Sequence, residues 1–262
     1  MLSRIMNRLR MYRLMLQFRG RVRNWQEAWR AIRTHTLGVT LQLRNGLIIR
    51  GECRDDVAWI FNEIFVERCY TPAWFYHPEP GHTVLDVGAN IGLFSLYLDS
   101  VAHGIRVLAF EPHPETFNVL TTNLAENHLE GTITARRLAV SRGPGEVRFS
   151  GLRGLDSGHD PATTTGLGEA VDCIGLSEAL ELAEGRPIDL LKVDTEGAEV
   201  EIISSAPLAI WSRIARVVVE YHDLGKRDEV VRSLESSGYQ CRVEPSRGFE
   251  GFLGLIYARR PA

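Results

Sequence analysis

Four short segments carry most of the residues whose types and spacing could do chemistry, and each stands where a strand is expected to end. In the first, residues 84–92, Asp86 precedes a glycine-rich turn with the spacing G-x-N-x-G. Gly88 lets the backbone turn tightly and a ligand approach closely, Asn90 tolerates left-handed backbone angles, and Gly92 permits close helix packing. The turn lacks the G-x-G-x-x-G spacing of dinucleotide-binding loops, which disfavours an NAD enzyme.

Glu111 stands at the expected tip of the next strand, 23 residues after Gly88. A carboxylate in this place can accept hydrogen bonds from the hydroxyls of a ribose. Together, the glycine turn and this acid predict an adenosine-type cofactor at the carboxyl edge of the sheet. The alternative is that Glu111 only supports the start of the following helix, because Pro112 and Pro114 stand beside it.

Two further segments end in polar residues. Residues 188–199 (IDLLKVDTEGAE) place Asp194 and Glu196 at the end of a buried strand. Lys192 shares a strand face with Asp194, and a lysine in an apolar strand must find a partner, although that pair could be purely structural. On the next strand, Glu220 and His222 share one face. If the two strands are neighbours, their polar tips meet at the sheet edge where open α/β folds bind ligands.

These segments are positioned by an alternation of strands and helices that begins at His82. The near-continuous apolar strands predict a doubly wound α/β fold, with a buried, mostly parallel sheet and helices on both faces. The connection at residues 245–251 is too short for a parallel crossover, so the last strand should be antiparallel. The glycine-rich residues 151–168 are expected to form a long loop. The expected strands are 82–88, 105–110, 132–140, 146–150, 188–194, 214–221, 239–244 and 252–259, and the expected helices are 91–101, 114–128, 176–184, 198–206 and 227–237.

Two segments precede this core, which is assigned to residues 81–262. Residues 1–35 are expected to form a basic amphipathic helical segment, because apolar residues recur at helical spacing between arginines over residues 2–18. Residues 36–80 hold a predicted β-hairpin at 38–50 with the turn Asn45-Gly46, then a helix from Asp55 to Arg68 and an aromatic connector at 70–77.

Charge is unevenly spread along the 262 residues. Residues 1–33 contain nine arginines and one acid, and the net charge is −3, so an arm of +8 precedes a body of −11. The net charge and the pI near 6.3 of the whole chain argue against nucleic-acid binding. The basic arm is expected to dock on this body, on a second copy of the chain as a homodimer contact, or on an anionic membrane surface.

The four cysteines show no C-x-x-C or C-x-x-H spacing, which favours a cytoplasmic protein, with contact to the inner membrane face as the alternative for the arm. There is no run of 18 uncharged apolar residues, so no membrane span is expected.

In this order and spacing the segments resemble the FkbM family of S-adenosylmethionine-dependent methyltransferases. The resemblance covers about residues 40–225 and rests on VLDVGANIGLFSLYL (84–98), AFEPHPETFNVLTTNL (109–124), LAVSRGPGEVRF (138–149), LLKVDTEGAEVEII (190–203) and VVVEYH (217–222). It implies a class I methyltransferase fold, which is Rossmann-like, and transfer of a methyl group to a hydroxyl of a sugar, glycolipid or polyketide-type natural product. The alternatives are an N-methyltransferase on the same scaffold, and a non-catalytic methyltransferase-like protein held at a membrane by residues 1–33.

The resemblance also implies roles for single residues. His222 is expected to take the proton of the acceptor hydroxyl, because imidazole titrates near neutral pH, with Asp194 or Glu196 as the alternative base or the orienting partner. Another possibility is a divalent metal that lowers the pKa of the hydroxyl, held by Asp194, Glu196, Glu220 and His222. Because acids at strand tips more often bind substrate or loop backbone, no metal is expected. The residues implied to hold S-adenosylmethionine are Asp86, Gly88, Asn90, Gly92, Glu111, Ser141 and Asp194.

Overall fold

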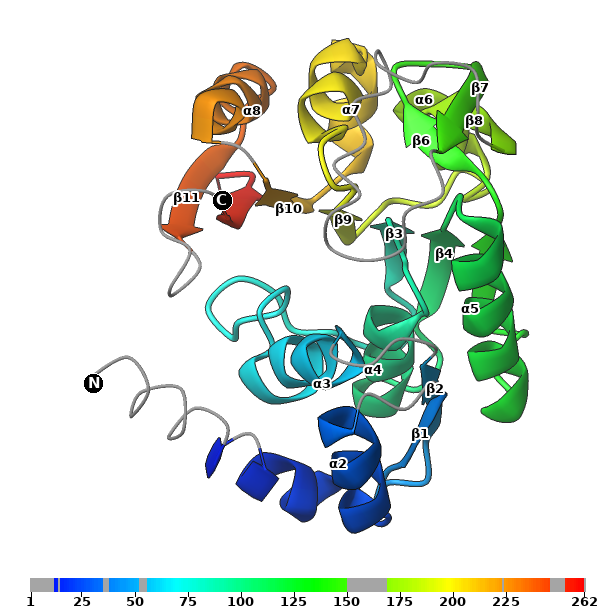
Figure 1. Cartoon of the computed structure of the whole chain (residues 1–262). Coiled ribbons are helices and arrows are strands. Elements are labelled where there is room, and N and C mark those ends of the chain that lie inside the picture. Colours follow the sequence, from blue (N-terminus) through cyan, green and yellow to red (C-terminus); the bar gives the residue numbers. More distant parts are fainter. Residues whose placement is uncertain are drawn as a thin grey trace.

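The computed structural model describes residues 12–13, 15–34, 38–51, 56–149, 169–222, 224–245 and 253–261. Its centre is a seven-stranded sheet in the order β11-β12-β10-β9-β3-β4-β5 (Figure 1). Neighbouring strands from β10 to β5 pair in parallel, whereas β12 is antiparallel to both β10 and β11. The predicted mostly parallel sheet with an antiparallel last strand is therefore confirmed. The strands are β3 (Thr83–Val87), β4 (Arg106–Phe110), β5 (Ile133–Arg136), β9 (Leu190–Val193), β10 (Arg216–Tyr221), β11 (Gln240–Pro245) and β12 (Gly254–Arg259).

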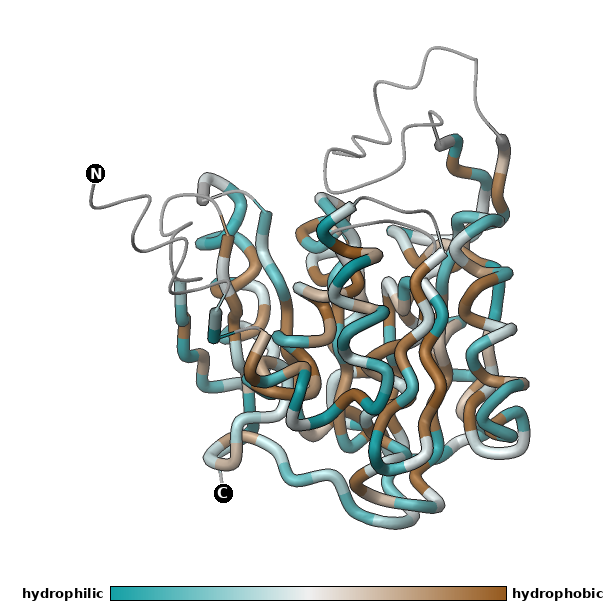
Figure 2. The backbone as a smooth tube through the Cα atoms, turned by 60° about the horizontal axis from the view of Figure 1, so that its bottom comes forward, coloured by the Kyte–Doolittle hydropathy of each residue, from teal (hydrophilic) through white to brown (hydrophobic). Residues whose placement is uncertain are grey.

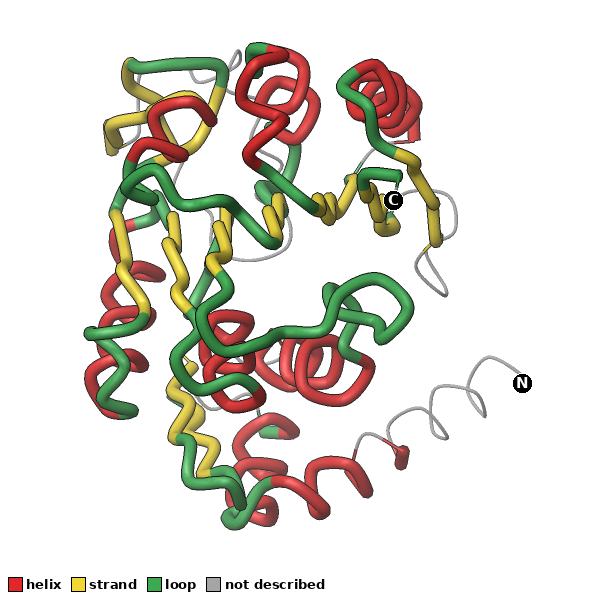
Figure 3. Tube along the Cα trace, turned by 180° about the vertical axis from the view of Figure 1, so that it is seen from behind, coloured by secondary structure: helices red, strands yellow, loops and turns green. Residues whose placement is uncertain are grey.

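Helices cover both faces of this sheet (Figures 1 and 3). Successive strand residues point to opposite faces, so Leu190 enters one apolar cluster with residues of α4 and α5, and Leu191 enters a second with residues of α6, α7 and α8. Hydrophobic and hydrophilic stretches alternate along the helices, as expected when one side of each helix faces a core (Figure 2). The helices are α4 (Leu93–Val101), α5 (Pro114–Glu126), α6 (Leu176–Glu181), α7 (Glu199–Ser205) and α8 (Leu224–Ser236), and a 3-10 helix, η2 (Leu208–Arg213), precedes β10.

The N-terminal part of the chain packs on the face that carries α4. The hairpin is confirmed, since β1 (Val39–Gln42) and β2 (Ile48–Gly51) pair antiparallel across Asn45-Gly46. The helix expected from Asp55 to Arg68 is an α-helix, α3 (Asp56–Phe61), continued by a π-helix, η1 (Asn62–Glu67), and Asp55 itself lies outside the described residues. Before the hairpin, residues 15–21 are helical and α2 (Trp25–Arg33) follows, but most of the predicted helix at 2–18 lies outside the described residues.

One expected strand is wrong. Residues 132–140 were expected to be continuous, but β5 ends at Arg136 and a separate strand, β6 (Ala139–Ser141), joins a second sheet. Arg136 and Arg137 are both exposed, so the alternation that keeps a strand in the buried sheet breaks there. The second sheet has the order β6-β8-β7, with β7 (Gly145–Phe149) and β8 (Glu169–Gly175), and β8 has no counterpart among the expected strands. Residues 151–168, the predicted loop, lie outside the described residues.

Among the described residues, every helix is too short or too polar to cross a lipid bilayer.

Candidate active site

The turn that follows β3 contains three residues with positive φ angles: Gly88 (77°), Asn90 (51°) and Gly92 (87°). Gly88 is the most constrained, because a Cβ atom there would lie 1.7 Å from the carbonyl oxygen of Asp194. At Gly92 a Cβ atom would stand 3.4 Å from the Leu120 side chain of α5, which is tight packing without a clash. The G-x-N-x-G spacing thus produces a backbone turn that only glycine can form at its first position.

Glu111 lies directly after β4 and is joined to this turn. Its Oε2 accepts a hydrogen bond of 2.9 Å from the backbone N–H of Asn90, and its Oε1 accepts one of 2.9 Å from the N–H of His113. Burial raises the pKa of Glu111 to about 7, although both hydrogen bonds oppose the shift. The carboxylate therefore links the glycine turn to the residue before α5. Glu111 can support the start of α5 and also lie beside the proposed cofactor site.

Lys192 connects the same turn to the tip of β9. Its buried Nζ donates to the carbonyl of Gly88 at 2.7 Å and lies 3.1 Å from Oδ1 of Asp86 and 3.5 Å from Oδ2 of Asp194. Burial alone would lower the pKa of Lys192, but the two carboxylates raise it above its ordinary value. Asp86 is fully buried and also accepts from the Ser95 hydroxyl at 2.8 Å. Lys192 thus has two acidic partners, Asp86 on the neighbouring strand β3 and Asp194 at the end of its own strand β9.

The turn between β9 and α7 arranges three carboxylates. Glu196 has a φ of 57° and Gly197 one of 125°, which is a sharp reversal of the chain. Oε1 of Glu199 accepts the backbone N–H groups of Thr195 and Gly197 at 3.1 and 2.9 Å, which fixes this carboxylate. Burial raises the pKa of Glu196 to about 7.

His222 follows β10 and lies among these carboxylates. Its Nδ1 is 3.2 Å from Oε1 of Glu199, and its Nε2 is 3.4 Å from Oε2 of Glu196 and 3.8 Å from Oδ1 of Asp194. Burial lowers the pKa of His222, but the hydrogen bond with Glu199 and the charges of Asp194 and Glu196 outweigh it and raise the pKa to about 10. Both ring nitrogens therefore face acceptors, and the imidazolium is the favoured form at neutral pH.

Glu220, on the same face of β10, has a different environment. Its Oε2 is 2.7 Å from the hydroxyl of Tyr70, which also lies 3.0 Å from Oδ2 of Asp194. Burial and the charge of Asp194 raise the pKa of Glu220 to about 8. The ligand atoms of Asp194, Glu196 and His222 lie within 4.8 Å of one another, close enough to share one cation, whereas Glu220 is not part of that group.

The structure thus brings most of the expected site residues together at one sheet edge. Asp86, Gly88, Asn90 and Glu111 surround the turn after β3, and Asp194, Glu196 and His222 adjoin it. Ser141 is buried in β6 of the second sheet, where it pairs with Gly175.

Two residues of the site were not assigned roles from the sequence. Tyr70 stands in the aromatic connector, where nothing in the spacing distinguishes it from its aromatic neighbours. Glu199 stands five residues after Asp194 in the DTEGAE segment, and an acid in the first turn of α7 was the available signal.

The arrangement of the sheet defines the class of protein. The strand order with an antiparallel β12 between β10 and β11 is that of class I methyltransferases. The crystal structure of Methyltransferase FkbM from Methylobacillus flagellatus KT is similar, with a TM-score of 0.54 and 16% identity over 72% of this chain and 46% of that chain. The present chain thus spans less than half of that longer protein.

Sequence comparison then gives the family. The sequence model of the Methyltransferase FkbM domain matches residues 86–241, and the chain belongs to this family. The "31-O-demethyl-FK506 methyltransferase FkbM" of Streptomyces tacrolimicus is 30% identical, over 85% of this chain and 97% of that protein. The "Hexuronic acid methyltransferase AglP" of Haloferax volcanii is 31% identical, over 67% of this chain and 70% of that protein. The protein is a methyltransferase by family and fold.

Proposed function

We propose that this protein is an S-adenosylmethionine-dependent O-methyltransferase whose cofactor binds beside the turn of residues 88–92. The observation that supports this most is the junction of three strand tips at one edge. Glu111 after β4 accepts the N–H of Asn90, and Gly88 after β3 lies against the carbonyl of Asp194 after β9. A tight glycine turn with a buried acid beside it suits a nucleoside with a ribose diol.

The charge of this edge fits a cationic cofactor. Five acidic side chains (Asp86, Asp194, Glu196, Glu199 and Glu220) surround two cationic groups, Lys192 and His222. Even with Glu220 protonated, four acids remain against the two cations. Such an excess of acids favours a positively charged ligand. When bound, S-adenosylmethionine supplies a methyl group that its positive sulfur already activates. The residues proposed to hold it are Asp86, Gly88, Asn90, Gly92, Glu111 and Asp194, with Ser141 assigned to the adenine side.

The remaining task of the chain is to orient an acceptor hydroxyl and remove its proton. We assign this to Asp194, Glu196 and His222. Glu196 has the most exposed side chain of the three, at 35%, and its raised pKa of about 7 suits a group that gains a proton near neutral pH. The His222 ring is already protonated at neutral pH, so it cannot accept a further proton from the acceptor hydroxyl. Its contacts with the carboxylates instead support a role in orienting Asp194 and Glu196.

The name of one relative specifies an oxygen as the acceptor atom, and that of another specifies a sugar acid, whose nucleophilic atoms are oxygens. One acts on 31-O-demethyl-FK506 and another on a hexuronic acid, according to their names. We therefore propose a hydroxyl of a sugar, a glycolipid or a polyketide-type product for this chain. Methylation of a nitrogen is the alternative outcome of the same assay.

Calorimetry and methyl transfer test the proposal in sequence. Purified protein should bind S-adenosylhomocysteine and not NAD, and binding of NAD alone would contradict the cofactor assignment. Methyl-labelled S-adenosylmethionine is then offered with a uronic acid, a glycolipid, a hydroxylated macrolide and an amine of similar size. Label in the hydroxylated compounds is expected. Glu196→Gln should lower kcat more than it changes cofactor affinity, and an undiminished kcat would exclude Glu196 as the proton acceptor.

The same assay examines the metal alternative. Because Asp194, Glu196 and His222 could share a cation, activity is measured after dialysis against a chelator and again with added magnesium. Unchanged activity is expected for proton removal by a carboxylate. Loss in the chelator and recovery with magnesium would favour the metal mechanism.

A further inference from the structure

Tyr70 lies outside the matched domain of residues 86–241, yet its hydroxyl ends inside the site. The hydroxyl is 3.0 Å from Oδ2 of Asp194, which follows β9, and 2.7 Å from Oε2 of Glu220 on β10. Tyr70 reaches both because even-numbered residues at these strand tips face the side of the sheet that the N-terminal part of the chain covers.

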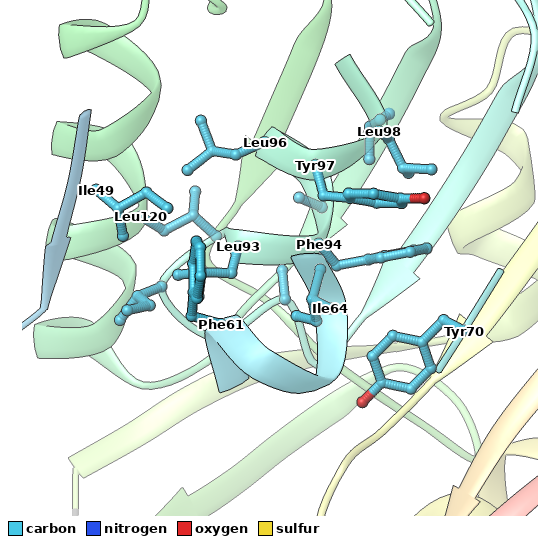
Figure 4. Packing of buried hydrophobic residues seen from close by; sticks show 14 of the residues in the cluster. Ile49, Phe61, Ile64, Tyr70, Leu93, Phe94, Leu96, Tyr97, Leu98 and Leu120 are labelled. Carbon is cyan, nitrogen blue, oxygen red and sulfur yellow. The ribbon is translucent and has the colours of Figure 1, made fainter. Parts of the chain in front are cut away.

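Tyr70 and its neighbours in the chain are held in place by contacts with α4 and β12. The ring packs edge-on against Phe94 of α4, with centroids 5.2 Å apart, and it lies at the margin of the buried cluster (Figure 4). The neighbouring residues are also tied to the core. The carbonyl of Cys69 accepts from the hydroxyl of Tyr257 on β12 at 2.6 Å, and the hydroxyl of Thr71 donates to that of Tyr97 on α4 at 3.2 Å. The phenol is thus a rigid group with a set position.

The Tyr70 hydroxyl lies within hydrogen-bond distance of two carboxyl groups, those of Asp194 and Glu220. A phenol carries one proton, so it can donate to only one of two carboxylates, and the other contact needs a proton on the carboxyl group. Lys192 lies 3.5 Å from Oδ2 of Asp194, and its Nζ also stands 5.2 Å above the Tyr70 ring. Within the described part of the chain, no ion pair shorter than 4.0 Å involves Glu220. Asp194 has Lys192 beside the same oxygen that Tyr70 contacts, so the Tyr70 O–H is assigned to the Asp194 carboxylate.

This arrangement orients the Asp194 carboxylate. Tyr70 and Lys192 both bind Oδ2, which leaves Oδ1 directed at Nε2 of His222, 3.8 Å away. A carboxylate held by two donors on one oxygen has little freedom to rotate.

We propose that Tyr70 is a positioning residue that fixes Asp194 for methyl transfer, so that the segment before the matched domain completes the active site. The inference rests on the proposed function, because Asp194 is assigned there to the cofactor and the acceptor hydroxyl. Tyr70 itself contacts neither, and its effect passes through Asp194.

Tyr70→Phe and a matched control test this role. The control is Tyr76→Phe, which also removes a phenol hydroxyl from the connector, but one bound to His82 at 3.0 Å rather than to the site. Tyr70→Phe should lower kcat by about tenfold or more, as for loss of a hydrogen bond to a charged group, and weaken the binding of S-adenosylhomocysteine by a smaller factor, because Asp194 is one of several residues proposed to hold the cofactor. Tyr76→Phe should retain the kcat of the unaltered protein. Equal kcat values for the two variants would overturn the inference.

A double-mutant cycle shows whether Tyr70 acts through Asp194. Asp194→Asn combined with Tyr70→Phe should be no slower than Asp194→Asn alone, and fully additive losses would overturn the inference. Placing 4-aminophenylalanine at position 70 restores a donor at the same ring position, and it should recover most of the lost kcat.

Crystal structures give a measurement that does not depend on turnover. In Tyr70→Phe, Oδ1 of Asp194 is expected to turn away from His222, whereas an unchanged carboxylate orientation would contradict the positioning role. Failure of the unaltered protein to bind S-adenosylhomocysteine would refute the proposed function. An active protein with an indifferent Tyr70 would refute only this inference.

Discussion

Gly88 and the carbonyl of Asp194 are packed so closely that the smallest added side chain has no room. A Cβ atom at Gly88 would lie 1.7 Å from that oxygen, and the φ of 77° disfavours any other residue as well. Gly88→Ala should therefore displace the tip of β9 and weaken binding of S-adenosylhomocysteine by about tenfold or more, measured by calorimetry.

Gly104 provides the control for this substitution. Its φ is 87°, but a Cβ atom there would meet nothing within 4 Å. Gly104→Ala should show only the backbone strain, about 1 kcal/mol, with cofactor affinity unchanged. Similar affinities for both variants would mean that the close approach at Gly88 does not shape the binding site.

The raised pKa of Glu111 predicts that the stability of the protein depends on pH. Its pKa in the folded protein is about 7, above the ordinary value of 4.5, so the folded state binds this proton more strongly than the unfolded state. The contribution of Glu111 to stability should therefore fall as pH rises from about 4.5 to about 7 and stay level above that, by up to about 3 kcal/mol. Glu111→Gln removes the titration, so the difference in unfolding free energy between the two proteins should change over this range in urea titrations.

The absolute stability of Glu111→Gln is less informative, because one of the two N–H groups bound by Glu111 loses its acceptor in the variant. A difference between the two proteins that stays constant with pH would show that Glu111 has an ordinary pKa.

At the scale of elements, the hairpin is attached to the core by side chains that imitate a strand. Asn123 of α5 accepts from the N–H of Arg50 at 2.7 Å and donates to its carbonyl at 3.0 Å. Asn127, just after α5, does the same with Ile48, at 2.8 and 2.7 Å. The two amides occupy the free edge of β2, which would otherwise expose unpaired backbone groups.

Replacing these amides should detach the hairpin. Asn123→Ala and Asn127→Ala are each expected to lower the free energy of unfolding by about 1–3 kcal/mol, because each leaves backbone groups of β2 without a partner. Asn118→Ala, at an exposed position of the same helix, is the control. Thermal unfolding checks this: alanine is the better helix former, so the control should be no less stable than the unaltered protein, and two variants as stable as the control would contradict the docking role of the amides.

At the scale of the whole molecule, the basic arm is in part a core element. Phe18 and Val22 are fully buried, and the Phe18 ring lies 5.1 Å from that of Phe61 in α3. Deleting residues 1–11 leaves these side chains in place and should preserve the melting temperature. Deleting residues 1–33 also removes Ala28 and Ile32, and should cost several kcal/mol at about 1.5–3 kcal/mol for each large buried side chain. Equal melting temperatures for the two deletions would contradict this packing.

The arginines of the basic arm form a positively charged surface that could bind another molecule. Arg13, Arg19, Arg21, Arg23 and Arg33 are exposed. We propose that this surface contacts an anionic membrane or a second copy of the chain. Replacing these five arginines with glutamine examines both, since loss of salt-sensitive binding to anionic vesicles would favour the membrane and a change in oligomer size would favour the homodimer.

Features that depend on neighbouring residues along the chain can be predicted from the sequence. Asn45-Gly46 predicts the hairpin turn through its left-handed backbone preference, and the alternation of apolar strands with helices predicts the doubly wound sheet. Acids placed just after strands predict an edge rich in carboxylates, because parallel strands end on the same side. The break at Arg136-Arg137 was readable in principle, as two successive exposed charges, but a β-rich run on both sides concealed it.

The groups that these acids contact depend on how the whole chain folds. Tyr70 lies 124 residues before Asp194, and no spacing rule connects them. Their contact exists because the connector crosses the sheet face to which residues 192, 194 and 220 point. The protonation of His222 follows in the same way, since its pKa depends on three carboxylates that the fold assembles around it. Local preferences act between adjacent residues, whereas the charge state of a site depends on the distances between groups that only folding brings together.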